Sequence, residues 1–312
     1  MPDVDCVVVN RDGGDALFRA LSSLEAQTGV DLSVVVVDNA SSAAERSRLE
    51  RQAPAARVVP LSANRGFAGA ANEGIAHGRA PFVLLVNNDA VLAPDYAARL
   101  AARLSLDGRI AAAQGMVLTA DGLRVDSAGL TWNDRGEALP ALAGSEPSRV
   151  PAGPFEISGV SATAALYRRE ALAAVSPAGD VFDRAFFAYY EDVDLSLRLA
   201  RAGWRFVCEP GAVARHEGSH TGRRTPLRRA LWTCRNRWRT LFRNFDGRWL
   251  AGRLGGLLKA DLAHARQLGW RGVLLPLLVW PALPVLACRT RPSGGLLFDW
   301  PSAPSTGMRA QG

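Results

Sequence analysis

The feature that most constrains this sequence is a set of unbroken apolar runs recurring through the first hundred residues. The clearest is Val34-Val35-Val36-Val37, and an apolar run of this kind is typical of a strand that is buried on both faces. Segments of helical length separate the runs. Buried strands alternating with helices predict an α/β fold, in which a mostly parallel sheet is covered by helices on both sides.

The apolar pattern predicts four strands and four helices in this region. The strands cover Val4–Asn10, Leu32–Asp38, Arg57–Leu61 and Phe82–Asn87, and the helices cover Gly14–Gln27, Ala43–Gln52, Phe67–Gly78 and Pro94–Leu104. The alternation ends after Gly108. Residues 109–185 are expected to mix strands with turns, and Pro140–Pro154, rich in proline and glycine, to form a loop or lid. A helix at Glu191–Ala202, closed by Gly203, and a strand at Phe206–Glu209 follow.

The C-terminal part of the chain differs in charge and composition. The net charge is +7, and residues 222–272 alone hold 13 arginine and lysine residues against 2 acidic ones. The same stretch carries Trp232, Trp238, Trp249 and Trp270. The chain is therefore expected to divide into a catalytic unit, 1–221, and a basic, largely helical extension, 222–312.

The apolar run Val273–Cys288 follows this basic stretch. It has 16 residues and is broken by three prolines, whereas a membrane-spanning helix needs about 20 apolar residues. In-plane contact with an anionic membrane surface is therefore expected. A covering helical layer or a homo-oligomer interface is the alternative. The charge would also permit nucleic-acid binding, but no nucleic-acid motif accompanies it, and no such partner is expected.

The cysteines and the amino terminus indicate the compartment. No two of the four cysteines have CxxC spacing, which favours free thiols in a reducing environment; they are Cys6, Cys208, Cys234 and Cys288. Residues 1–5 lack the basic and apolar regions of a secretory signal. A cytoplasmic location is expected, peripheral to the inner face of the cell membrane.

Polar side chains follow three of the expected strands. They are Asp38-Asn39-Ala40-Ser41, Asn64-Arg65-Gly66-Phe67 and Asn87-Asn88-Asp89. Each cluster alone is more typical of a helix N-cap or turn than of a binding site. Because ligands of open parallel sheets bind at the carboxyl ends of the strands, three clusters in succession predict a polar ligand there.

The glycines near the second cluster exclude two common phosphate sites. Gly66, Gly69 and Gly74 do not have the GxGxxG spacing, and no GxxxxGK[ST] loop occurs in the chain. The small residues around Gly66 therefore either let a helix start approach a ligand or allow close helix packing.

Asp89 is the candidate metal ligand. A divalent cation that bridges a diphosphate needs only one or two protein carboxylates, although Asp89 could also cap a helix. His216 could complete a site with Asp89. The alternative is that His216 is an isolated surface histidine that binds no metal.

The stretch Phe186–Asp194 places Glu191, Asp192 and Asp194 at the start of a helix, behind four aromatic residues. The helix dipole favours carboxylates at this position, so capping is one explanation. Capping does not require the aromatic residues. Aromatic rings suit a sugar-stacking surface beside a base, and an ionised aspartate can accept a hydroxyl proton. The residue types alone do not single out one of the three.

Taken together, these motifs resemble glycosyltransferase family 2, and particularly its bacterial rhamnosyltransferase-like branch. The resemblance extends from about Val4 to about His220. It rests on the order and spacing of Val34–Ser41, Asn64–Gly74, Leu84–Asp89, Ser158-Gly159, Tyr190–Leu195 and His216.

The resemblance implies a GT-A fold that uses a nucleoside-diphosphate sugar and a divalent cation, Mg²⁺ or Mn²⁺. The implied donor nucleotide-binding residues are Asp38, Asn39, Ser41, Asn64, Arg65, Gly66 and Asn88. The implied metal ligands are Asp89 and His216, and the implied acceptor-side residues are Gly159, Tyr190 and Glu191. Asp192 is implied as the general base of a single displacement with inversion. Asn87 stands where the family has the first carboxylate of its DxD motif.

The expected function is therefore transfer of a sugar, with L-rhamnose as the candidate, from a dTDP- or UDP-sugar to a glycan or lipid-linked acceptor in cell-surface polysaccharide synthesis. The alternative is a catalytically silent module that binds nucleotide sugars or glycans. Such a module would keep the Asp38 cleft and need neither metal nor base. The presence of Asp89, Asp192 and His216 argues against it.

Overall fold

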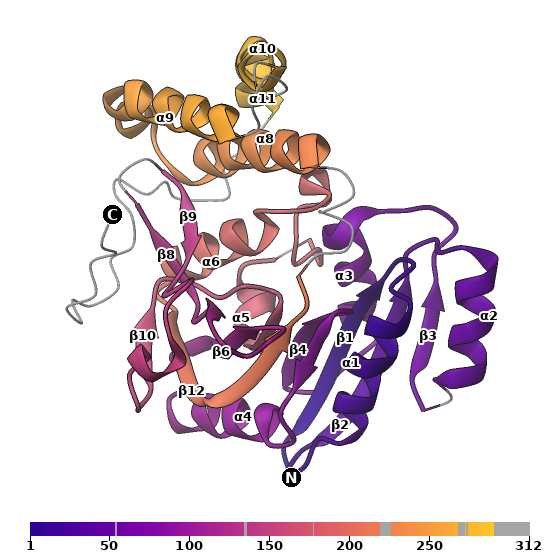
Figure 1. The fold of residues 1–312 in the computed structure, drawn as a ribbon. Coiled ribbons are helices and arrows are strands. Elements are labelled where there is room, and N and C mark those ends of the chain that lie inside the picture. Colours follow the sequence, from indigo (N-terminus) through magenta and orange to yellow (C-terminus); the bar gives the residue numbers. More distant parts are fainter. Residues whose placement is uncertain are drawn as a thin grey trace.

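A central β-sheet carries helices on both faces, and further helices stack beyond one end of it (Figure 1). The computed structural model describes residues 1–53, 55–133, 136–176, 178–218, 226–267, 272 and 274–289. The strand order along the sheet is β10-β12-β6-β11-β4-β1-β2-β3.

The valine-rich runs form the parallel part of the sheet. β1 (Asp3–Asn10) lies between β2 (Asp31–Asp38) and β4 (Phe82–Asn87), and β2 pairs with β3 (Arg57–Pro60), all in parallel. The connecting helices are α1 (Asp15–Glu25), α2 (Ala43–Gln52) and α3 (Gly66–Ala76). The sequence predictions for this region are confirmed to within a few residues.

The second half of the sheet is mixed. β6 (Ile110–Thr119) pairs in parallel with β12 (Arg205–His216), whereas β11 (Ala164–Arg168) runs antiparallel to β4 and β6. Short strands complete it: β5 (Ala90–Leu92), β7 (Val125–Ser127) and β10 (Phe155–Ile157). β8 (Leu130–Trp132) and β9 (Ala138–Pro140) form a separate hairpin. The connecting helices are α4 (Tyr96–Leu106), η1 (Pro147–Arg149), α5 (Arg169–Ala174) and η2 (Arg184–Phe186).

Helices cover both faces of the sheet, as predicted. Apolar side chains of α1, α2 and α4 pack with one face, and those of α3, α5 and α6 (Glu191–Arg201) pack with the other. The alternate residues Val7 and Val8 of β1 belong to the two different clusters, as expected for a strand buried on both faces. Three cysteines, Cys6, Cys208 and Cys234, are buried free thiols.

One strand prediction was wrong in its extent. The strand expected at Phe206–Glu209 continues to His216, because a register shift against β6 accommodates the chain between Glu209 and Val213. Pro210 and Gly211 lie within this bulge, where both residue types are tolerated. His216 is consequently the last residue of β12.

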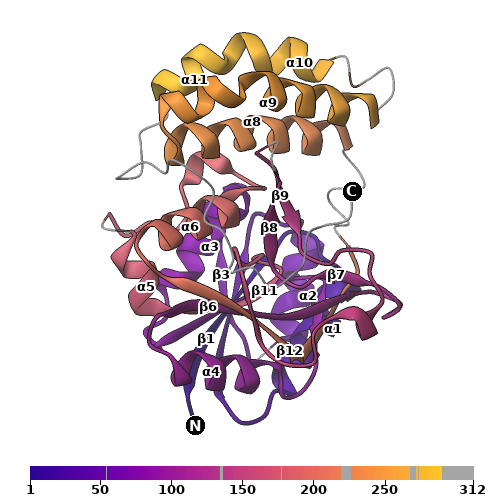
Figure 2. The same cartoon turned by 90° about the vertical axis from the view of Figure 1, so that its left-hand side faces the viewer.

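The C-terminal helices form successive layers over the end of the sheet (Figure 2). They are α8 (Pro226–Asn244), α9 (Gly247–Gln267), α10 (Leu274–Val279), η4 (Trp280–Ala282) and α11 (Leu283–Arg289). α8 lies on α6, and Val193 and Leu197 of α6 share an apolar cluster with Trp238 and Leu241 of α8. The expected helical character of this region is confirmed for the described residues. The expected boundary at residue 221 lies outside them.

Much of the positive charge on α8 is neutralised within the protein. Arg239 and Arg243 contact Asp183, and Arg243 also contacts Asp194 of α6. Arg237 pairs with Asp261 of α9 at 2.6 Å. The basic composition of the region therefore reflects contacts to acidic residues of the protein as well as exposed charge. Among the described residues, none of the helices has both the length and the hydropathy that crossing a bilayer requires.

Candidate functional site

The first candidate group lies at the carboxyl ends of the parallel strands. Asp38 ends β2 and is fully buried. Its Oδ1 accepts a hydrogen bond from the amide of Ser41 at 3.1 Å. Its Oδ2 is buried and has no hydrogen-bond partner among the described residues. A buried acceptor left unpaired costs about 1–3 kcal/mol, so this oxygen can serve a donor group of a ligand.

Asn39 connects the first two polar clusters. Its Nδ2 donates to Asn64 Oδ1 at 3.0 Å, and its Oδ1 accepts from the amide of Arg65 at 2.8 Å. Asn64 Oδ1 also accepts from the amide of Gly66. These contacts hold the loop between β3 and α3 against the end of β2. The Arg65 side chain is largely exposed and pairs with Glu73 at 3.2 Å.

Asn10 is a neighbour of this group that the sequence analysis missed. It ends β1 directly opposite Asp38 and is fully buried. Its Oδ1 accepts from Asn88 Nδ2 at 2.8 Å, while its own Nδ2 has no described partner. The signal that could have identified Asn10 is its position at the end of the first parallel strand. Ser41 also lies here, and its hydroxyl accepts from the amide of Asp12 at 3.0 Å.

Asp89 and His216 lie together, as the metal hypothesis requires. His216 of β12 pairs with Ala90 of β5, which places Asp89 next to it. Asp89 Oδ1 is 3.2 Å from His216 Nε2. On its other side, His216 Nδ1 is 2.9 Å from Asp126 Oδ2 on β7. Asp126 was not anticipated from the sequence, because β7 lies in the irregular region.

Burial alone would lower the pKa of His216. The hydrogen bond to Asp126 and the negative charges of Asp126 and Asp89 outweigh burial and raise the pKa to about 9. Although Nε2 approaches Asp89, it lacks the geometry of a hydrogen bond. We therefore attribute that contact to electrostatic attraction, and the bond to Asp126 fixes the orientation of the ring.

This pair fits a divalent cation in part. Two ligands about 2.1 Å from one cation and about 90° apart lie about 3 Å from each other, close to the separation of Asp89 Oδ1 and His216 Nε2. A carboxylate bonded to the second nitrogen of a ligating histidine is the usual arrangement, and Asp126 has that position. Within the described part of the chain, no group of three or more histidine, cysteine or acidic side chains could hold a metal on its own. Diphosphate oxygens and water would have to complete the coordination.

The three carboxylates at the start of α6 have different environments. Asp194 is fully buried and bonded to Arg198, Arg243 and Asn244, which gives it a structural role. Glu191 is 7% exposed, and its Oε2 has no described partner. Asp192 is half-buried, and its Oδ2 accepts from the amide of Ala162 at 3.1 Å. Asp192 is therefore the most accessible of the three.

The neighbouring carboxyl groups of Glu191 and Asp192 both have raised pKa values. Burial, and then the charge of Asp192, raise the pKa of Glu191 well above its usual value. Burial also raises the pKa of Asp192, but the amides of Ala162 and Val193 oppose this shift by donating to its carboxylate. These hydrogen bonds favour the ionised form of Asp192.

Two backbone contacts join the base side of the site to the donor side. The amide of Asn87, at the end of β4, donates to the carbonyl of Thr163 at 2.9 Å, next to the Ala162 amide that binds Asp192. The carbonyl of Phe187 accepts from the amide of Ala68 in α3 at 3.1 Å.

Gly66 and Gly74 are explained by close packing. A Cβ on Gly66 would lie 2.2 Å from the carbonyl oxygen of Phe187, and one on Gly74 would lie 2.3 Å from Val7. Of the two readings of these glycines, packing is the one that the structure supports. Gly159 is likewise buried, and a Cβ there would lie 2.7 Å from Ser196 of α6.

The aromatic residues that precede α6 have a strained backbone. Phe187, Tyr189 and Tyr190 have φ angles of 66°, 71° and 71°. Non-glycine residues in this region each cost about 1–3 kcal/mol and persist only where surrounding structure holds them. The Phe187 ring packs on Trp232 of α8, with centroids 5.0 Å apart. Tyr190 is part of the apolar contact with α8, and burial raises its pKa to about 12.

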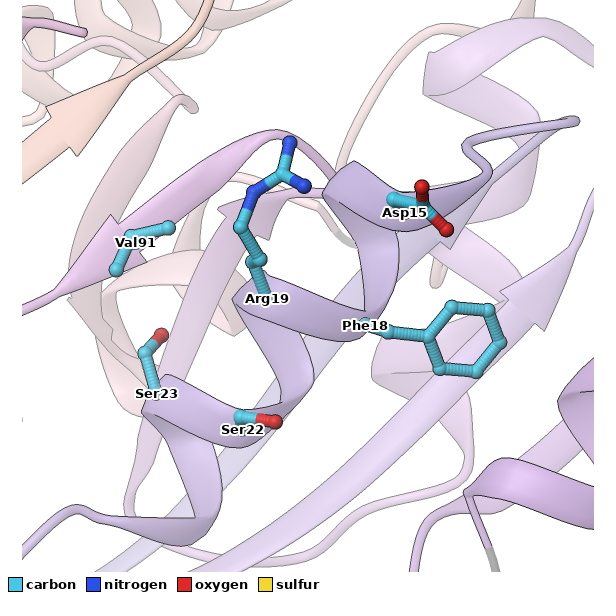
Figure 3. A pocket seen from close by; sticks show the side chains of 6 residues that line it. All are labelled: Asp15, Phe18, Arg19, Ser22, Ser23 and Val91. Atoms are coloured by element: carbon cyan, nitrogen blue, oxygen red, sulfur yellow. The ribbon is translucent and has the colours of Figure 1, made fainter.

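A separate open pocket lies on the outer side of α1 (Figure 3). The side chains that line it are Asp15, Phe18, Arg19, Ser22, Ser23 and Val91. None of these is a candidate site residue. We therefore place the candidate site at the carboxyl ends of the strands.

Solved structures share this fold. The chain matches a structure of GalNAc-T7 with UDP, GalNAc and Mn²⁺ at a TM-score of 0.59 and 14% identity, covering 79% of this chain and 49% of that one. It matches the mannosyltransferase PcManGT from Pyrobaculum calidifontis, in complex with GDP-Man and Mn²⁺, at a TM-score of 0.57 and 20% identity, covering 95% and 79%. These neighbours are GT-A glycosyltransferases, so the predicted GT-A fold is confirmed.

Sequence comparisons identify the family. N-acetylglucosaminyl-diphospho-decaprenol L-rhamnosyltransferase from Mycobacterium tuberculosis is 29% identical over 247 residues, which cover 70% of this chain and 78% of that protein. Succinoglycan biosynthesis protein ExoO from Rhizobium meliloti is 34% identical over 124 residues, which cover 39% and 36%. The model of glycosyl transferase family 2 matches residues 5–175, just over half of the chain. On this evidence the chain belongs to glycosyl transferase family 2.

Proposed function

We propose that the protein is a metal-dependent, inverting glycosyltransferase with Asp192 as its general base. The observation that carries this proposal is the environment of Asp192. It is the most accessible of the three carboxylates and accepts a hydrogen bond from the amide of Ala162, and one peptide unit links Ala162 to the carbonyl that holds Asn87. Inverting sugar transfer needs a base near the anomeric carbon of the donor, on the face opposite the diphosphate, and this contact supports a location of Asp192 close to the donor site.

In the proposed reaction, the carboxylate of Asp192 accepts the proton of an acceptor hydroxyl. The hydroxyl oxygen attacks the anomeric carbon of the donor sugar from the face opposite the diphosphate. The bond from that carbon to the diphosphate oxygen breaks, and the nucleoside diphosphate leaves with both electrons. A single attack from the opposite face inverts the anomeric configuration.

The donor nucleotide is proposed to bind along the ends of β1 and β2. Asp38 Oδ2 would accept a hydrogen bond from an N–H of the base or an O–H of the ribose, and Asn10 Nδ2 would donate to an oxygen of the ligand. Asp89 and His216 would hold a divalent cation, Mg²⁺ or Mn²⁺. When bound, such a cation neutralises charge that develops on the diphosphate.

A dTDP- or UDP-linked sugar, with L-rhamnose as the candidate, is the proposed donor. A glycan or lipid-linked acceptor of cell-surface polysaccharide synthesis is the proposed acceptor. The names of the rhamnosyltransferase and succinoglycan relatives support this choice. Gly159, Tyr190 and Glu191 are proposed to line or support the acceptor side.

A donor panel tests this proposal. Purified protein is incubated with dTDP- and UDP-sugars, with Mn²⁺ or with EDTA, and released nucleoside diphosphate is measured with and without a diphospholipid-linked N-acetylglucosamine acceptor. We expect metal-dependent release that rises with acceptor, and a product of inverted configuration by NMR. Binding of donor without any release, with or without metal, would favour a silent binding module instead.

We also propose that the C-terminal unit attaches the enzyme to the inner face of the cell membrane. Leu277, Leu278 and Val285 of α10 and α11 are 63%, 56% and 54% exposed on the outermost layer of helices. The exposed basic residues Lys259 and Arg266 lie on α9. Apolar side chains beside cations suit an anionic lipid surface.

Vesicle sedimentation tests the attachment. Binding to vesicles that contain phosphatidylglycerol, weak binding to phosphatidylcholine, and loss of binding in Leu277→Ser/Leu278→Ser are expected. If the wild-type protein ignores vesicles and sediments as a dimer that the same substitutions dissociate, the surface is an oligomer interface.

A further inference from the structure

The strained segment before α6 is held by two consecutive residues of α8. Asn236 is fully buried. Its Nδ2 lies 2.8 Å from each of the carbonyl oxygens of Phe186, Ala188 and Tyr189. Arg235 Nη2 lies 3.0 Å from the carbonyl of Phe186 as well. The two N–H groups of one side-chain amide therefore serve three carbonyls of a turn directly before the proposed base, so at least two of these carbonyls share a donor.

These carbonyls converge because of the backbone conformation. Phe187 has φ 66° and ψ −65°, and the amide of Ala188 donates to the carbonyl of Phe186, which is the pattern of a strained γ-turn. Tyr189 is left-handed. A backbone in this conformation directs its carbonyls to one side, where only a buried donor can satisfy them. The amide of Asn236 is that donor.

We propose that Asn236 is a positioning residue for sugar transfer, which rests on the proposed role of Asp192 as base. By holding the carbonyls of Phe186–Tyr189, Asn236 fixes the left-handed entry into α6. This backbone conformation determines the positions of Asp192 and of the aromatic side chains before it relative to the acceptor. α8 is in this way a part of the transfer site, although it lies outside the nucleotide-binding half of the fold.

Contacts from α3, on the donor side, also constrain the position of this segment. The amide of Ala68 donates to the carbonyl of Phe187, and Gly66 approaches the same carbonyl so closely that no Cβ fits. α3 contacts the segment from one side and α8 from the other. A shift of the segment therefore changes the separation between Asp192 and the donor site, on which the rate of attack depends steeply.

Asn244 offers a matched control on the same helix. It is also fully buried, and its Nδ2 donates to Asp194 of α6 at 2.9 Å. It bonds α6, the helix that carries Asp192, through Asp194 and Arg201. Loss of its side chain should weaken the docking of α8 without releasing the turn.

The test compares Asn236→Ala, Asn236→Gln and Asn244→Ala in the full chain. For each variant, Tm, the Kd of the nucleoside diphosphate with Mn²⁺, and the kcat and acceptor KM of transfer are measured. We expect both alanine variants to lower Tm. Only Asn236→Ala should lower kcat, by about 10- to 100-fold, with the nucleotide Kd within about threefold of wild type. Asn236→Gln, which keeps the amide, should recover part of kcat.

Equal kcat values in Asn236→Ala and Asn244→Ala, at matched folded fraction, would overturn the proposal. So would a loss of kcat that Asn236→Gln does not relieve at all. If Asn236→Ala does not fold, Asn236→Ser takes its place, because a single hydroxyl donor can satisfy only one of the three carbonyls. Failure of the proposed function would give a different result. Asp192→Asn would then transfer sugar at the wild-type rate, whatever the kcat of Asn236→Ala.

Discussion

Asp89 Oδ1 and His216 Nε2 lie 3.2 Å apart because β12, which ends at His216, pairs with β5, which begins directly after Asp89. The second nitrogen of the His216 ring contacts Asp126. The two residues that the sequence suggested as metal ligands, Asp89 and His216, thus form a connected group of three side chains with Asp126.

This chain predicts a distinct effect of Asp126→Asn. The substitution keeps the shape of the side chain but weakens the bond that orients His216, so Mn²⁺ affinity in the presence of nucleoside diphosphate should fall about 10- to 100-fold. Calorimetric titration measures it. Asp121→Asn, in the turn before β7, is the control and should leave the affinity unchanged. An unchanged affinity in Asp126→Asn would remove Asp126 from the site.

Asp38→Asn should weaken nucleotide binding. The buried Oδ2 has no described partner and is proposed to accept a hydrogen bond from an N–H or O–H of the nucleotide. An amide nitrogen in its place is a donor, so it cannot accept that bond. A loss of about 1–3 kcal/mol, or about 5- to 150-fold in Kd, is expected for UDP or dTDP. Asp31→Asn, at the exposed start of β2, serves as control. If Asp38→Asn binds both nucleotides as tightly as wild type, the ligand does not contact this oxygen.

Glu191→Gln should change how stability depends on pH. Burial raises the pKa of Glu191 in the folded state, so its contribution to stability is present below the pKa of the unfolded chain and is lost as pH rises through the folded pKa. Glutamine does not titrate. The unfolding free energy of Glu191→Gln relative to wild type should therefore increase above about pH 4.3, by about 1.4 kcal/mol per pH unit. Urea unfolding at several pH values measures it, and parallel profiles would contradict the assignment.

Asp194→Ala should destabilise the whole protein. It removes a buried carboxylate that pairs with Arg198 at 3.0 Å and Arg243 at 2.9 Å, and leaves both cations without it. A loss of about 3–5 kcal/mol in unfolding free energy is expected. Asp180→Ala, which breaks the exposed pair with Arg184, should cost at most about 1 kcal/mol. Comparable effects of the two substitutions would mean that the docking of α8 on α6 contributes little to the unfolding free energy.

The sequence was sufficient for the parallel half of the sheet. Unbroken valine runs and polar strand ends depend on local patterns that the fold preserves, so Asp38, Asn64 and Asp89 could be expected at one edge. Asn10 has the same position at the end of β1 as Asp38 has at the end of β2, but an asparagine at a strand end is equally common in a turn, so it was missed. Asp126 and the full length of β12 were missed because they depend on long-range pairing in the irregular region, where a bulge continues a strand past Pro210.

The three carboxylates of α6 show where sequence reasoning reaches its limit. Glu191, Asp192 and Asp194 are equivalent as residue types at a helix start. Their difference comes from what packs against them: arginines of α6 and α8 on Asp194, apolar burial on Glu191, and the amide of Ala162 on Asp192. None of these partners can be identified without the tertiary structure.

The rate of sugar transfer by Asp192→Asn tests the central claim most directly. With the matched donor and acceptor at saturation, and nucleotide binding confirmed separately, the account predicts a fall in kcat of about 10²- to 10⁴-fold, because a general base supplies about that much. The wild-type rate should itself decline on the acid side at a pH above the usual pKa of an aspartate, since burial raises the pKa of Asp192 and only its charged form accepts a proton. A variant that transfers sugar at a rate within a few-fold of wild type would contradict the assignment of Asp192 as the base.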